Sequence, residues 1–199
     1  LFGSFGFLRS GTVGMIAQAD GSKDYEEIIN IFLRNIAFVI IISLLLIILQ
    51  TYIYNISLSI FELSQETKLY FNDYFTFRIY SSFGELTIFV ITGLFIGLQK
   101  TKTSSLIVGF YSLANIILSL VFVLYFNLNV LGVALGTLVA STLTTIIFLF
   151  YTFYDLSMMT KLEFNSKKIF NLSKVKNIFN INLNIFIRSL LLAFAFLYF

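Results

Sequence analysis

The longest uncharged stretch of the sequence is Thr103–Tyr154, TSSLIVGFYSLANIILSLVFVLYFNLNVLGVALGTLVASTLTTIIFLFYTFY, in which none of the 52 residues is Asp, Glu, Lys or Arg. Asn127, Asn129 and Gly132 lie near its middle and predict a turn there. About 20 residues of α-helix cross a hydrocarbon core of about 30 Å, so each half is long enough to span a membrane. The stretch therefore predicts two consecutive transmembrane helices.

Similar apolar segments flank this pair on both sides. The chain of 199 residues is 58% hydrophobic and 12% charged, whereas soluble domains carry about 25% charged residues. The ten-residue alternation of outer-membrane barrel strands is not present. The predicted fold class is therefore all-α, a polytopic transmembrane helix bundle. We predict spans at roughly 1–17, 35–61, 79–99, 103–126, 130–154 and 178–199, and we expect the first and last to be truncated.

The basic residues of the connections indicate the orientation in the membrane. Nine Lys and Arg residues fall in the connections 18–34, 99–102 and 155–177, whereas the opposite side has only Lys68 and Arg78. Positively charged loops stay in the cytoplasm, so we predict that these three connections are cytoplasmic. The formal net charge of +3 is explained by these loops, and we expect no nucleic-acid partner.

Residue types that most catalytic sites need are missing. The sequence has no Cys and no His, which excludes thiol chemistry, Cys/His metal sites and imidazole acid–base catalysis. It also lacks a phosphate-binding loop, a nucleophile elbow and a cluster of metal ligands. We therefore expect neither an enzyme nor a bound cofactor or metal.

Arg9, Glu85 and Arg188 fall within predicted spans and Arg78 lies at the edge of one, and charge inside a membrane is costly and marks candidate functional sites. Arg78 and Glu85 are seven residues apart, so they share nearly one helix face about 10 Å apart along the axis. Arg78 can reach the outer interface by snorkelling. Glu85 lies deeper and is equally compatible with a structural partner for a basic group and with a proton-titrating site. Arg188 and Arg9 each require a carboxylate, a carbonyl or a water-filled cavity.

Two polar stripes follow helical spacing within the uncharged stretch. They consist of Ser112, Asn115 and Ser119 on the first helix and of Thr137, Ser141 and Thr144 on the second. Such stripes can line an aqueous cavity and coordinate a cation through oxygen atoms. They can also form interhelical hydrogen bonds, which is the commoner role. The pairs Gly93/Gly97 and Gly132/Gly136 add the small-xxx-small spacing of closely packed helices.

An ordered series of motifs resembles the multidrug and toxic compound extrusion (MATE) transporters, DinF-like branch. The motifs are Phe7–Gly14 (FLRSGTVG), Ala17–Gly21 (AQADG), Asp73–Ile79 (DYFTFRI), Gly93–Lys100 (GLFIGLQK), Asn115–Val123 (NIILSLVFV), Leu131–Thr137 (LGVALGT) and Ile185–Leu190 (IFIRSL). The resemblance covers essentially the whole chain. It implies a twelve-helix, two-lobe protein of which this chain is a fragment.

The resemblance also implies an organisation and a function. Residues 1–154 would form the N-lobe without its first helix and with a truncated second, 155–177 a cytoplasmic linker, and 178–199 the truncated first helix of the C-lobe. The full-length protein would be a monomeric antiporter of the bacterial inner membrane, exporting organic or cationic compounds in exchange for H⁺ or Na⁺ by alternating access. The alternatives are a lipid-linked-saccharide flippase of the same superfamily, which favours a strongly cationic cavity, and a non-transporting membrane scaffold.

The family's N-lobe cation site corresponds to Asn115, Ser119 and Thr137 by resemblance. Ser119 stands where the family usually has Asp, so a carboxylate that could bind a proton or a cation is missing. We hypothesise that Glu85 substitutes for it as the titrating group. Phe83 stands where the family usually has Pro, and the sequence has no Pro at all, which puts a proline-dependent helix bend in question.

Overall fold

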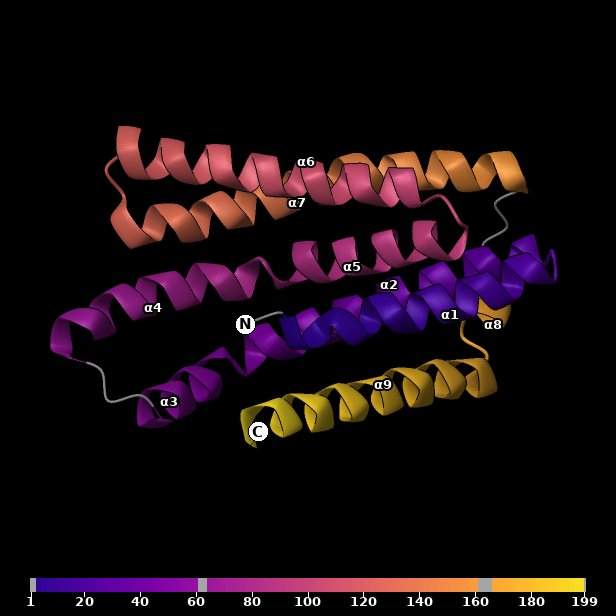
Figure 1. Cartoon of the computed structure of the whole chain (residues 1–199), viewed down its shortest axis with the longest axis horizontal. Coiled ribbons are helices and arrows are strands. Elements are labelled where there is room, and N and C mark those ends of the chain that lie inside the picture. The colour runs from indigo at the N-terminus through magenta and orange to yellow at the C-terminus, as the bar shows by residue number, and fades with distance from the viewer. Residues whose placement is uncertain (1–2, 61–63, 161–165, 199) are drawn as a thin grey trace.

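The computed structural model describes residues 3–60, 64–160 and 166–198, which form helices and contain no strand. A short 3₁₀ turn, Gly3–Gly6, precedes α1 (Figure 1). The helices are α1 Phe7–Gly21, α2 Tyr25–Ile48, α3 Gln50–Ile60, α4 Gln65–Tyr80, α5 Ser82–Gly97, α6 Thr101–Leu120 with the π-helical turn Val121–Tyr125, α7 Asn129–Met159, α8 Ser166–Ile169 and α9 Leu172–Tyr198. The predicted all-α helix bundle is confirmed.

The long helices lie side by side and run back and forth along one common direction (Figure 1). Among the described residues, three helices are long and apolar enough to cross a membrane, namely α2, α6 with its π-helical turn, and α7. Helices α4 and α5 meet the same criterion together, as a pair bent by 46°. The chain is therefore a multi-pass membrane protein.

Several helices extend beyond the apolar segments from which they were predicted. Helix α2 begins at Tyr25, inside the predicted connection 18–34, because the Asp24 carboxylate caps it by accepting from the Glu27 N–H at 3.0 Å. The predicted span 35–61 is divided at Leu49 between α2 and α3. Polar helix-forming residues continue a helix past its lipid-facing part, so hydropathy marks the membrane layer and not the helix ends.

The basic segment 155–177 is also more helical than expected. Helix α7 continues to Met159, α8 lies within the segment, and α9 begins at Leu172, before the predicted start of the last span at 178. Residues 161–165 of the segment lie outside the described residues. The turn predicted near Asn127 is present, and both Asn127 and Asn129 adopt positive φ angles of 55° and 46°. Asn is one of the few residues that tolerates this left-handed backbone.

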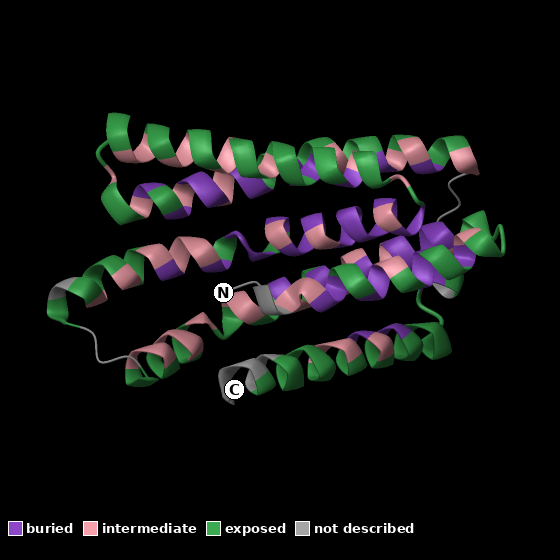
Figure 2. Cartoon of the chain, in the orientation of Figure 1, coloured by how far each residue is buried: buried purple, intermediate pink, exposed green. Residues whose placement is uncertain are grey.

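The apolar core lies where α1, α2 and α5 meet, and the buried residues concentrate on these helices in Figure 2. Gly93 and Gly97 make the close approach of α5 to α1 possible. A Cβ atom at Gly93 would lie 2.8 Å from the carbonyl oxygen of Arg9, and one at Gly97 would lie 2.7 Å from the Cβ of Ile16. By contrast, α6 exposes most of its apolar side chains, as expected for a helix that faces lipid.

The bend between α4 and α5 forms without proline. Ser81, the residue that divides α4 from α5, keeps both of its backbone hydrogen bonds, since Ser81 N donates to Phe77 O at 3.2 Å and Glu85 N donates to Ser81 O at 3.0 Å. Helix α7 supports the bend from the side, because the Thr145 hydroxyl donates to the Gly84 carbonyl at 3.0 Å. The departure from the family pattern at Phe83 therefore does not remove the bend.

Candidate functional site

The three residues assigned to the N-lobe cation site come together between α6 and α7. Asn115 Nδ2 donates to Thr137 Oγ1 at 3.2 Å, and the Ser119 hydroxyl donates to Asn115 Oδ1 at 3.1 Å. Gly136 makes this contact possible, because a Cβ atom there would lie 2.5 Å from Ser119 Oγ and 2.7 Å from Ser119 N. The two polar stripes therefore face each other where Asn115 and Ser119 of α6 meet Thr137 of α7.

This cluster offers oxygen atoms and no carboxylate. An amide oxygen and two hydroxyl oxygens are ligands that a hard cation such as Na⁺ accepts. Thr137 also donates to the carbonyl oxygen of Val133 at 3.0 Å, which fixes its hydroxyl in the cluster. Within the described residues, no group of three or more His, Cys, Asp or Glu side chains could hold a metal ion.

Arg78 and Glu85 form an ion pair across the bend between α4 and α5. A second contact joins Arg78 Nη2 and Glu85 Oε2 at 3.5 Å, and Ser81 Oγ donates to Glu85 Oε1 at 3.2 Å. Both charged side chains are largely buried, with 13% and 12% of their side-chain surface exposed. The spacing of seven residues correctly indicated a shared face, and the hypothesis that Glu85 titrates stays a prediction.

Tyr111 joins the ion pair to the oxygen cluster, and the sequence reasoning did not single it out. Its phenol on α6 lies close enough to Arg78, Glu85 and Asn115 to interact with all three. The spacing in the sequence could have identified Tyr111, because it precedes Asn115 by one helical turn and therefore lies on the same helix face. The polar groups thus extend from the α4–α5 bend through Tyr111 to Asn115.

Arg9 and Arg188 lie outside this group of residues. Arg9 is exposed on α1, and its guanidinium lies over the ring of Phe89 with 5.9 Å to the ring centroid, a cation–π geometry. Arg188 is exposed on α9. Neither of them forms an ion pair within the part of the chain that the structure describes.

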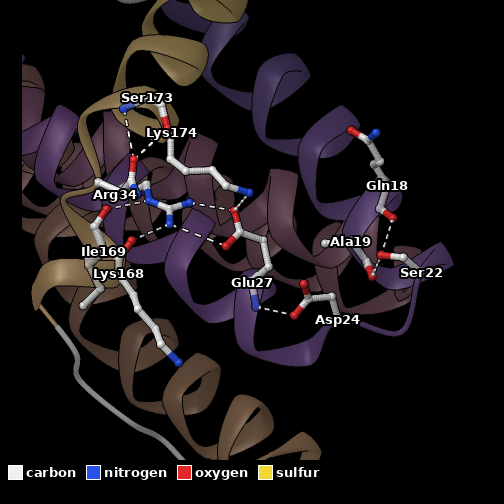
Figure 3. Close-up of polar contacts among 11 residues, drawn as sticks. Gln18, Ala19, Ser22, Asp24, Glu27, Arg34, Lys168, Ile169, Ser173 and Lys174 are labelled. Carbon is white, nitrogen blue, oxygen red and sulfur yellow. Dashed lines mark hydrogen bonds and ion pairs between the residues drawn. The ribbon is translucent and has the colours of Figure 1, made fainter.

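A second polar cluster lies at the end of the bundle where α1, α2, α8 and α9 meet (Figure 3). Its centre is Arg34 on α2, which is buried and bonds Glu27 on the same helix and two backbone carbonyls of α8. Sequence reasoning counted Arg34 only as a loop cation, because its acceptors are backbone oxygens far away in the chain. A polar cavity of about 320 Å³ lies beside Glu27 and Arg34.

Comparisons with known proteins agree with this architecture. The family model described as MatE matches residues 1–121. DNA damage-inducible protein F of Escherichia coli (strain K12) is 26% identical over 141 residues, which cover 71% of this chain and 31% of the relative. An outward-facing multidrug resistance MATE family transporter of the MOP superfamily superposes with a TM-score of 0.82 at 19% identity, over 98% of this chain and 43% of that chain.

A transporter of the MOP superfamily from Pyrococcus furiosus, described by the reverse polarity of its binding pocket, gives a TM-score of 0.83 at 19% identity. The match covers 98% of this chain and 43% of that chain. This chain thus spans less than half the length of each of these relatives.

Proposed function

Since the MatE model matches well over half of its residues, this chain belongs to the MatE family of membrane transporters, and from this premise we propose a cation-coupled efflux antiporter. The full-length protein would export organic or cationic compounds in exchange for Na⁺ or H⁺. The two lobes would move against each other around a central cavity. Asn115, Ser119 and Thr137 would bind the coupling ion, with no further cofactor.

The observation that carries this proposal is the convergence of oxygen atoms between α6 and α7. Asn115, Ser119 and Thr137 come from two helices and lie within hydrogen-bond distance of one another. A bound cation also needs negative charge nearby, since a charge in a membrane is costly without a partner. Glu85 would supply such a charge when its ion pair with Arg78 opens, and Tyr111 interacts with both Glu85 and Asn115.

The proposed organisation follows the relatives of greater length. Residues 1–154 would be most of the N-lobe, 155–177 would connect the lobes, and α9 would be the first helix of the C-lobe. The basic connections would face the cytoplasm of a bacterium, with the protein as a monomer in the inner membrane. Sequencing the DNA on both sides tests this organisation. It should reveal an upstream apolar span that carries Asp or Glu and about five further spans downstream.

A flippase for lipid-linked saccharides is the second candidate. It favours a strongly cationic cavity, but the ion pair with Glu85 offsets the charge of Arg78. The positive charges of Arg9 and Arg188 lie on other helices, at exposed positions. The geometry therefore supports the antiporter better. A non-transporting scaffold would need neither an intramembrane carboxylate such as Glu85 nor a repeat of these spans downstream.

Reconstituted full-length protein tests the proposed function directly. A cationic dye loaded into proteoliposomes should be transported when a Na⁺ or pH gradient is imposed. Asn115→Ala should reduce this gradient-dependent rate at least about tenfold, because it removes the amide that joins Ser119 to Thr137, a loss of about 1.4 kcal/mol of ion binding. Gradient-independent rates in the wild-type protein would contradict the antiporter, and an unaffected Asn115→Ala variant would contradict the assigned site.

Introducing at position 119 the carboxylate that the family usually has there should strengthen cation binding. Ser119→Asp would place a negative charge beside Asn115 and Thr137, and carboxylate oxygens bind hard cations more tightly than hydroxyls do. We expect the Na⁺ concentration for half-maximal transport to fall about tenfold, which corresponds to about 1.4 kcal/mol. Ser119→Asn is the matched uncharged control and should not reproduce the effect. Equal Na⁺ dependence of the two variants would rule out a cation at this position.

A further inference from the structure

The buried side chain of Arg34 holds α8 against α2. Arg34 Nε donates to the carbonyl oxygen of Ile169 at 2.6 Å, and Nη2 donates to that of Lys168 at 2.9 Å (Figure 3). The last carbonyls of a helix have no partner within the helix, so a guanidinium with several donors satisfies two of them at once. Nη1 bonds Glu27 at 2.9 Å, which balances the buried charge.

The contacts of α9 with the same cluster are of a different kind. Lys174 of α9 donates to Glu27 Oε1 at 3.1 Å, but 52% of the Lys174 side chain is exposed, compared with 4% for Arg34. An exposed ion pair is screened by water and contributes little to stability, whereas a buried, multiply bonded arginine is costly to detach. The cluster therefore holds α8 firmly and α9 weakly.

The packing of α9 on α1 contains a second weak point. Asn182 is 1% exposed, and its amide nitrogen and oxygen both lack a hydrogen-bond partner. It lies against Gly11 of α1, where a Cβ atom would be 2.4 Å from Asn182 Oδ1. A buried polar group without a partner disfavours the arrangement that buries it. This cost would be relieved whenever α9 moves away from α1.

We propose that α9 pivots at Phe170–Asn171, and that Arg34 is the positioning residue that keeps α8 with the N-terminal bundle on the fixed side of that pivot. The junction is short and locally defined, since Asn171 Oδ1 accepts from Ser173 N at 3.1 Å where α9 begins. The inference rests on the proposed function in one respect. Alternating access moves the two lobes against each other, and this movement would separate α9 of the C-lobe from α1 of the N-lobe.

Distance measurements test the role of Arg34 without any assay of transport. This chain has no Cys, so spin labels can be attached to Glu26→Cys and Lys168→Cys in full-length protein freed of other cysteines. These positions report on α2 and α8, since their native side chains are 2.8 Å apart. Arg34→Gln should widen the distance distribution about twofold, because α8 loses its buried anchor. Lys174→Gln, which breaks only the exposed pair, should leave it unchanged.

Unchanged distances in a folded Arg34→Gln variant would overturn the role of Arg34, and so would an equal widening in Lys174→Gln. Folding of each variant is checked by size-exclusion chromatography. If Arg34→Gln does not fold, Arg34→Lys provides the same comparison, since it keeps the charge and loses the fork that bonds two carbonyls.

Crosslinks test the position of the pivot. A disulfide between Gly11→Cys and Asn182→Cys would join α1 to α9 where the two helices are in close contact. We expect it to reduce transport at least about tenfold, with recovery on reduction. A short bifunctional thiol reagent across Glu26→Cys and Lys168→Cys should leave transport intact.

The opposite pattern, or equal inhibition by both crosslinks, would overturn the pivot. Absence of transport in the wild-type protein would instead contradict the proposed function, and the distance measurements on Arg34 would still decide its role.

Discussion

Glu85→Gln is expected to lower the free energy of unfolding of the full-length protein by about 3 kcal/mol, because Arg78 would remain largely buried without its counter-charge. The same substitution should remove the pH dependence of efflux if Glu85 is the titrating carboxylate. Thermal unfolding in detergent and efflux from proteoliposomes at several pH values measure the two effects. Asp73→Asn is a control on the exposed part of α4 and should change stability by less than about 0.5 kcal/mol.

The double variant Arg78→Gln/Glu85→Gln separates a structural role from a titrating role. Removing both charges leaves no unpaired ion, so stability should return to within about 1 kcal/mol of the wild-type value. If Glu85 titrates during transport, the double variant stays insensitive to pH although it is stable. A return of normal pH dependence in the double variant would show that Glu85 is only the partner of Arg78.

Gly136→Ala should separate α6 from α7 and open the oxygen cluster. The added Cβ would meet backbone as well as side chain, lying 2.7 Å from Ser119 N and 2.8 Å from Ser119 Cα, so rotation of a side chain cannot relieve the clash. Overpacking of this kind costs about 1–3 kcal/mol. The hydrogen bond between Asn115 and Thr137 lies one residue away, so cation-dependent efflux should fall at least about tenfold.

Gly109→Ala is the matched control on α6. A Cβ atom at Gly109 has no neighbouring atom within 4 Å, so the variant should gain helix propensity without a clash. We expect it to be more stable than the wild-type protein by up to about 1 kcal/mol. The two alanine variants should therefore change the melting temperature in opposite directions. Destabilisation of equal size in both would show that close packing at Gly136 is not the cause.

The uncharged stretch was sufficient to predict the helix pair α6–α7 and the turn between them. It also showed that Asn115 and Thr137 each belong to a polar stripe on one helix face, whereas only the resemblance to MATE transporters implied that they belong to one site. Their proximity is observed, whereas their part in ion binding stays a prediction. The approach of Arg78 to Glu85 was foreseeable from a spacing of seven residues.

The environment of Arg34 could not be predicted in this way. Its acceptors are the carbonyl oxygens of Lys168 and Ile169, and every residue carries such an oxygen, so the sequence contains no mark of the contact. The ends of α2 and α7 were missed for a related reason. Hydropathy reports which residues face lipid. Capping residues and polar residues extend a helix beyond the lipid-facing segment, and they leave the hydropathy of that segment unchanged.

The bend between α4 and α5 has a mechanical consequence. A proline ring removes a backbone donor and fixes a bend, whereas here the residues of the bend keep their backbone donors, and Ser81 N and Glu85 N both donate to carbonyls of the preceding turn. Side-chain contacts support the angle: Thr145 of α7 donates to the Gly84 carbonyl, and the ion pair between Arg78 and Glu85 joins α4 to α5 across the bend. The curvature of the α4–α5 span therefore depends on side-chain contacts, and we expect a displacement of α7 or a change of charge at Glu85 to alter it.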